Sequence, residues 1–254
     1  MKIENIAKEI FAQAVLLDQN GGLRNTIYGI DREIFILNYD HTILLKFDLL
    51  KSDDPFETPI SFKANDYDSD TFEAKDSKII FYTKLGDYEK QKICGTTDLT
   101  PKEVRELFYT YESPKGDAVS LSKDVLTLLD FDLSHVEFSG KAGKTIRMLQ
   151  RNIYSGGIIK IEKIAKGMFP ETLKHDFGPI AIKTNDLRAL FVFNDVLKFS
   201  FPSNEGNEDY ILVTGGSTGI RKVHGIIACC LYDEIIKLKT IGNGRKEQKV
   251  RRRQ

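Results

Sequence analysis

The sequence predicts an α+β protein of two domains with a similar plan, each built from an antiparallel sheet and one or two helices. Three observations support this prediction. The chain has 254 residues, which is enough for two domains of ordinary size. Short runs rich in β-branched and aromatic residues fill most of it. Each half opens with one helical segment before its strands begin.

In the first domain, 1–111, apolar residues at helical spacing predict an amphipathic helix over 3–17. A second helix is expected over 100–111, where Pro101 follows Thr100 and suits a first helical turn. The predicted strands lie between them, in "NTIYGI", "REIFILNY", "TILLKFDLL", "PISFKA", "KIIFYTKL" and "YEKQKICGT", with Gly86-Asp87 as the turn of the last pair.

A polar segment with Pro and Gly, 112–118, predicts the linker to a second domain over 119–236. Ser122 is the expected N-cap of its first helix, in "LSKDVLTLLDF", and "NDLRALFVF" is the expected second helix. The "KIIFYTKL" strand pair of the first half resembles the "DVLKFSFP" and "DYILVTG" pair of this half, which suggests a duplication. The other predicted strands are "HVEFSG", "KTIRMLQRN", "GIIKIEKI", "PIAIKT" and "KVHGIIACCLY".

The charge is distributed unevenly. The whole chain has a net charge of zero, but residues 237–254 contain eight basic residues and one Glu, a net charge of +7. Residues 1–236 therefore carry −7. A basic tail suits an electrostatic contact with nucleic acid, and a solvated, disordered terminus is the alternative.

Composition excludes several classes of protein. No apolar run approaches the roughly 20 residues of a membrane helix, and the N-terminus has no apolar signal region, so no membrane partner is expected. The three cysteines form no Cys-x-x-Cys pair, so neither a disulfide framework nor a zinc site is predicted. We expect a cytoplasmic protein, in the host cytoplasm if a phage encodes it.

Two glycine-rich stretches resemble nucleotide-binding loops. "TGGSTGI", 214–220, lacks the following helix and βα units that a dinucleotide site requires, and we expect a turn between two antiparallel strands. "SGKAGKT", 139–145, has Phe138 where a Walker loop needs its first Gly, and we expect a basic hairpin turn.

No catalytic or metal-binding motif is complete. "DYDSD", 66–70, spaces its acids like an EF-hand loop, but Thr71 and Ser77 occupy the positions of the required Gly and Glu. The four histidines show no metal-ligand spacing, and no Gly-x-Ser-x-Gly is present. The sequence therefore predicts no catalytic residues, metal or cofactor.

The order of elements resembles that of the PCNA-like sliding clamps, the trimeric processivity factors of T-even phages, archaea and eukaryotes. The resemblance covers about 1–236 and is best over 178–232, where strand, short helix, hairpin and closing strand follow in the family's order. "LSKDVLTLLDFDLSHVEFSG" and "IENIAKEIFAQAVLLDQ" resemble the helices that open the two clamp domains. The chain departs from the pattern at 64–73, a poor helix former where the family has a helix, and at 100–111, where it has none.

The resemblance implies a protein that catalyses no reaction. Its curved sheets would form an outer shell, and its helices would face sequence-independent double-stranded DNA inside a homotrimeric ring. It implies DNA contacts by basic residues on or beside those helices: Lys2, Lys8, Lys123, Lys141, Lys144, Arg147, Lys183 and Arg188. A DNA polymerase and a clamp loader would bind an apolar site beside the linker, for which the candidates are Leu107, Phe108, Tyr111, Ile226 and Leu231.

Two alternatives from other classes stay open at this point. One is a strand-rich phage structural or assembly protein, which makes protein contacts only. The other is a metal-dependent nuclease or nucleotidyltransferase that uses Asp66, Asp68 and Asp70.

Overall fold

The chain divides into two compact units in a computed structural model. The first contains Met1–Glu112 with Thr214–Ile226, and the second contains Ser113–Val213 with Ile227–Gln254. Residues Thr214–Ile226, which the sequence assigned to the second domain, thus group with the first. The structure describes residues 9–15, 25–51, 55–67, 72–75, 78–85, 88–94, 97–111, 117–130, 132–151, 158–160, 172–192, 194–202, 210–215 and 222–229.

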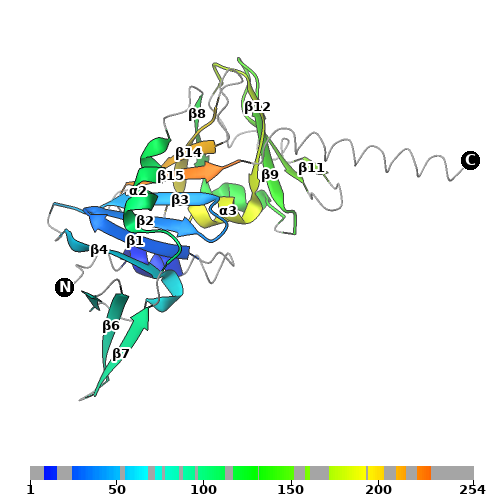
Figure 1. Ribbon diagram of the computed structural model, residues 1–254. Coiled ribbons are helices and arrows are strands. Elements are labelled where there is room, and N and C mark those ends of the chain that lie inside the picture. Colours follow the sequence, from blue (N-terminus) through cyan, green and yellow to red (C-terminus); the bar gives the residue numbers. More distant parts are fainter. Residues whose placement is uncertain are drawn as a thin grey trace, which may run out of the picture. The chain divides into compact units, whose positions relative to one another are not determined.

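The main sheet of the first unit has the strand order β4-β1-β2-β3-β15 (Figure 1). The first four strands pair antiparallel, in the register Ile27↔Ile36 and Ile27↔Phe62 on one face and Tyr28↔Phe35 on the other. The strands are β1 (Asn25–Asp31), β2 (Glu33–Asn38), β3 (Ile43–Asp48), β4 (Phe56–Lys63) and β15 (Val223–Ala228).

The two faces of this sheet bind different helices. Residues 9–15 are helical, within the predicted 3–17, and Phe11 contacts Phe62 edge to face at 5.4 Å between ring centroids. Helix α2 (Pro101–Thr110) packs on the opposite face, where Phe108 contacts Phe35 at 5.7 Å. Because neighbouring residues of a strand point to opposite faces, this sheet is covered on both sides.

A second sheet in the first unit contains β5 (Phe72–Lys75), β6 (Lys78–Leu85) and β7 (Tyr88–Cys94). The ring of Phe81 on β6 contacts the ring of Phe62 on β4, with 5.2 Å between the centroids, so the two sheets share an aromatic contact. The register pairs Leu85 with Tyr88, as a two-residue hairpin requires. The predicted turn Gly86-Asp87 itself lies outside the described residues.

The second unit contains a sheet of order β14-β13-β8 and a sheet of order β11-β10-β9-β12. Its core is aromatic: Phe177 stacks on Phe201 at 4.7 Å, and Phe138 contacts Phe201 at 5.4 Å. The strands are β8 (Ala118–Ser122), β9 (His135–Gly140), β10 (Arg147–Arg151), β11 (Ile158–Lys160), β12 (Phe177–Lys183), β13 (Val196–Ser200) and β14 (Tyr210–Gly215).

The first helix of the second unit differs from the prediction. Ser122 caps it as expected and accepts a hydrogen bond from the Asp124 amide, but η2 (Lys123–Leu128) is a 3₁₀ helix. The side chain of Gln150, which is fully buried, binds both the amide and the carbonyl of Asp130. These bonds hold the backbone just beyond η2 in a non-helical path, so the helix stays short.

Both units turn from a strand directly into a short helix. Strand β4 leads into the 3₁₀ helix η1 (Ala64–Asp66), and β12 leads into α3 (Thr184–Leu190). The caps Lys63 and Lys183 have nearly the same backbone angles, φ −70° and ψ 137° against φ −63° and ψ 137°. The sequences there are "PISFKANDY" and "PIAIKTNDL", an internal repeat that supports two domains of one plan.

These observations confirm the predicted fold class. The described residues form mostly antiparallel sheets with few helices, arranged as two units of similar plan. The predicted helix over 100–111 and the predicted strands are present, apart from segments outside the described residues. The stretch after "TGGSTGI" is strand β15, as the hairpin prediction requires, whereas a dinucleotide site would have a helix there.

Replacing Gly140 by Ala is expected to destabilise the protein. A Cβ at Gly140 would overlap the buried Leu173 and lie 2.6 Å from a ring atom of Phe177, so both must shift, at a cost of about 1–3 kcal/mol. Gly178→Ala is the matched control, since its nearest contact would be 3.3 Å. Urea unfolding of both variants measures the difference. Equal free energies of unfolding would show that the loop around Leu173 does not pack on β9 as described.

Candidate nucleic-acid and partner interfaces

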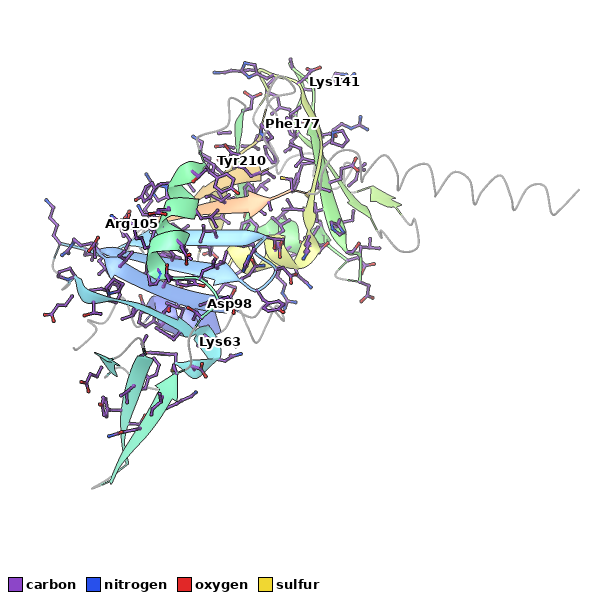
Figure 2. All side chains as sticks on the ribbon, in the orientation of Figure 1. Lys63, Asp98, Arg105, Lys141, Phe177 and Tyr210 are labelled. Atoms are coloured by element: carbon purple, nitrogen blue, oxygen red, sulfur yellow. The ribbon has the colours of Figure 1, made fainter. Side chains whose placement is uncertain are left out.

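The basic residues that the sequence singled out lie at three places in the second unit. Lys141 and Lys144 belong to the hairpin between β9 and β10 (Figure 2). Arg147 and Lys183 lie on strands, and Lys123 and Arg188 lie on η2 and α3. Lys2 and Lys8 fall outside the described residues. The six residues therefore lie on one hairpin, on two strands and on two different helices.

The pair on strands shares one face of a sheet. Lys183 pairs with His135, and Arg147 pairs with Ser139, so all four side chains leave the same face of the β10-β9-β12 strands. The alternate residues, such as Phe138, point to the opposite face and are buried. Arg147 is exposed and Lys183 is half-buried. This face lies away from the aromatic core and carries the two basic residues together with the buried Glu137, which lies between His135 and Ser139 on β9.

The two basic residues on helices, Lys123 and Arg188, differ in how exposed they are to solvent. Lys123 is exposed and lies 3.6 Å from the carboxylate of Asp195. Arg188 is half-buried, and five of the seven residues of α3 are buried. Thr184 fixes the start of α3 by donating a 2.6 Å hydrogen bond to the carbonyl of Leu133. Helix α3 is mainly a core element, and Arg188 is its basic residue.

Lys183 also acts on a neighbouring histidine. Burial, and secondly the positive charge of Lys183, lower the pKa of His135 from 6.5 to about 4. The ring is therefore neutral at neutral pH. It adds no charge to the face that carries Arg147 and Lys183.

The hairpin "SGKAGKT" has a structural explanation for its glycines. Gly143 adopts a left-handed conformation with φ 74°, and the Lys144 amide donates to the Lys141 carbonyl at 3.0 Å to close the turn. Gly140 gives room to Leu173. A strand, β10, follows the hairpin, whereas a Walker loop leads into a helix.

The predicted partner site centres on α2. Thr100 and Glu103 form a capping box with Pro101 in the first turn, which accounts for the start of the helix. Leu107 and Tyr111 lie four positions apart and are both 37% exposed, so they share one accessible stripe. Phe108 is half-buried against Phe35, and Ile226 is 5% exposed within β15 and offers little surface. Leu231 lies outside the described residues.

A charged network holds α2 to its sheet. Arg105 binds Asp31 and Glu33, each at 2.8 Å, and Figure 2 shows Arg105 on α2. Tyr109 donates to Glu33, which also pairs with Lys46 at 3.1 Å. Together with the buried Val104 and the Phe108–Phe35 contact, these bonds fix the helix.

Lys46 is the centre of this network. Its ammonium lies 2.9 Å from Asp48 and 5.3 Å from the centroid of the Tyr109 ring. Burial by itself lowers the pKa of Lys46, but hydrogen bonds with Asp48, Tyr109 and Glu33 outweigh burial and raise it. Lys46 therefore stays charged over the whole neutral range and neutralises the buried Glu33.

Of the acidic cluster 66–70, the structure describes the carboxylate of Asp66. Asp66 lies 3.6 Å from Lys92, whose ammonium also donates to the Asn65 carbonyl at 3.3 Å. Asp68 and Asp70 fall outside the described residues. Within the described part of the chain, no three His, Cys, Asp or Glu side chains are grouped so as to hold a metal ion.

Sequence reasoning missed three features. It did not find the network of Lys46, Glu33 and Arg105, because those residues are far apart in the chain and only strand pairing joins them. It did not assign Lys63 a role as the counterpart of Lys183, although aligning "PISFKANDY" with "PIAIKTNDL" identifies it. It also overlooked Lys174 and His175, which no motif marks.

Comparison with solved structures identifies the fold. A PCNA2–PCNA3 complex from Sulfolobus tokodaii matches with a TM-score of 0.54 and 10% sequence identity, over 90% of this chain and 99% of that chain. The chain has a PCNA-like clamp fold. A scan against models of protein families finds no match, and a search of curated proteins finds no similar sequence.

The structure contains both departures from the clamp pattern that the sequence showed. Within the described residues, 64–66 form the three-residue 3₁₀ helix η1 in place of a longer helix. Helix α2 covers the sheet face opposite the helix at 9–15 (Figure 1). In the described part of the chain, no helix has the length and apolar character needed to cross a membrane.

Replacing His135 by Gln is expected to reduce the loss of stability on acidification. The folded ring has a pKa of about 4, whereas the unfolded ring binds a proton near 6.5. The unfolded state thus binds more protons between these values, and stability present above pH 6.5 is lost as the pH falls toward 4. Urea midpoints at about pH 7 and about pH 5 for wild type and variant measure the effect. An identical fall in both proteins would contradict it.

Proposed function

We propose that the protein is a DNA sliding clamp, a processivity factor that encircles duplex DNA and tethers a replicative polymerase. The observation that carries this proposal is the PCNA-like fold over 90% of the chain. The role needs no catalytic residue or cofactor, since a clamp acts by position alone.

The distribution of charge supports a contact with DNA that does not depend on the base sequence. A sliding protein must bind phosphates without reading base edges, and Lys and Arg on the surface supply such contacts. Lys123, Lys141, Lys144 and Arg147 are exposed, and Lys183 and Arg188 are half-buried. Residues 1–236 carry −7 overall, so DNA is repelled by much of the remaining surface.

Ring closure would use open sheet edges. Among the described residues, β7 has only β6 as a neighbour in the first unit, and β11 has only β10 in the second. Two different edges on one chain suit a head-to-tail contact, which generates a closed ring, such as a trimer, when the rotation between neighbours closes. Ile93 of β7 is 61% exposed, so this edge strand offers an apolar side chain to a neighbouring chain.

The stripe on α2 would serve the polymerase and the clamp loader. Leu107 and Tyr111 offer apolar surface directly before the linker. A short peptide with apolar anchors is the kind of partner that such a surface binds.

The proposal is tested by topological retention. The protein is mixed with a linear duplex that carries biotin at both ends, and streptavidin is then added to block the ends. At a salt concentration that abolishes electrostatic binding, we expect retention on blocked DNA and release when a nuclease cuts the duplex, because a ring leaves only over an end. Equal retention on blocked and unblocked DNA would contradict encirclement.

A further inference from the structure

Two loops of the second unit are joined into one structure. The hairpin 141–144 and the loop 172–176 exchange two backbone hydrogen bonds, from the Gly143 amide to the Leu173 carbonyl at 2.9 Å and from the Leu173 amide to the Lys144 carbonyl at 3.0 Å. Leu173 is buried against Gly140. The loops therefore move together and present one surface, here called the hairpin–loop surface.

Two carboxylates also hold these loops by accepting hydrogen bonds from their backbone amides. Asp117 accepts hydrogen bonds from the amides of Lys174 and His175, both at 2.8 Å, and its side chain is 11% exposed. Asp176 accepts from the amide of Ala142 at 2.8 Å. Both acids bind backbone amides, and Asp117 is almost withdrawn from solvent, whereas Asp176 is exposed and leaves one negative charge on this surface.

The same loops also carry basic side chains, of which His175 lies with its Nδ1 3.5 Å from the Asp117 carboxylate. Lys141, Lys144, Lys174 and His175 are all exposed, and Figure 2 shows Lys141 beyond the end of β9. The two loops thus place the pair of lysines singled out from the sequence next to two basic residues that it did not mark. The hydrogen bonds already order the backbone of both loops before a ligand binds, which lowers the entropic cost of binding.

We infer that the hairpin–loop surface binds the phosphate backbone of duplex DNA. Its lysines are flexible point charges, which suit phosphate oxygens and carry no base specificity. The inference takes its ligand from the proposed function and adds Lys174 and His175 to the contact. It places a DNA contact on loops, separate from the helices that carry Lys123 and Arg188.

The test is equilibrium binding of the full chain to a short linear duplex with free ends, measured by fluorescence anisotropy over a series of salt concentrations. The variant replaces Lys141, Lys144 and Lys174 by Ala. We expect the slope of log affinity against log salt to fall by up to about 0.9 for each lysine that contacts a phosphate. A matched control replaces three exposed lysines elsewhere by Ala: Lys51, Lys102 and Lys198.

An unchanged slope in the first variant, or an equal fall in both variants, would overturn the inference. Anionic phospholipid vesicles provide a second probe. Loss of vesicle binding in the first variant with DNA binding intact would also overturn it, because the surface would then serve a membrane. A free-ended duplex cannot retain a ring, so this result is independent of the retention experiment. Failure of retention with a reduced slope would reject the clamp and keep the DNA contact.

Discussion

The fold depends on one constraint that occurs twice, a strand that turns within a single residue into a short helix. At Lys63 and at Lys183 the backbone is still extended, and the next residue, Ala64 or Thr184, is buried and begins the helix. The alternation of the preceding strand buries Phe62 in one unit and Ile182 in the other. Each unit thereby sets its short helix at the end of a sheet, and the similarity of the two sequences indicates that one solution was used for both.

Outside these corners the two units use different chemistry to secure their surfaces. The first unit fixes α2 with a buried charged network around Lys46 and Glu33, where removal of one partner would leave an uncompensated charge. The second unit fixes its loops through the Asp117 carboxylate and backbone bonds, over an aromatic core that includes Phe177 and Phe201.

Local signals sufficed to predict much of this fold. The helix α2 follows from Thr100, Pro101 and Glu103, and most of the strands follow from their β-branched and aromatic runs. The early end of η2 could not be predicted, because Gln150 holds the backbone of Asp130 just beyond the helix from twenty residues further along the chain. Lys174 and His175 join Lys141 and Lys144 only through backbone bonds between distant loops, which no periodicity reports. The sequence shows which residues are basic, but it does not show how the fold distributes them over a hairpin, strands and helices.

Sedimentation equilibrium over a wide range of concentrations tests the central claim, that the clamp fold forms a closed ring, most directly. The account predicts a limiting mass of about three chains of 28.9 kDa, with no larger species, because a head-to-tail ring has no free edge left. A mass of one chain at every concentration would contradict it, as would an open series of growing assemblies, which would instead indicate a structural protein.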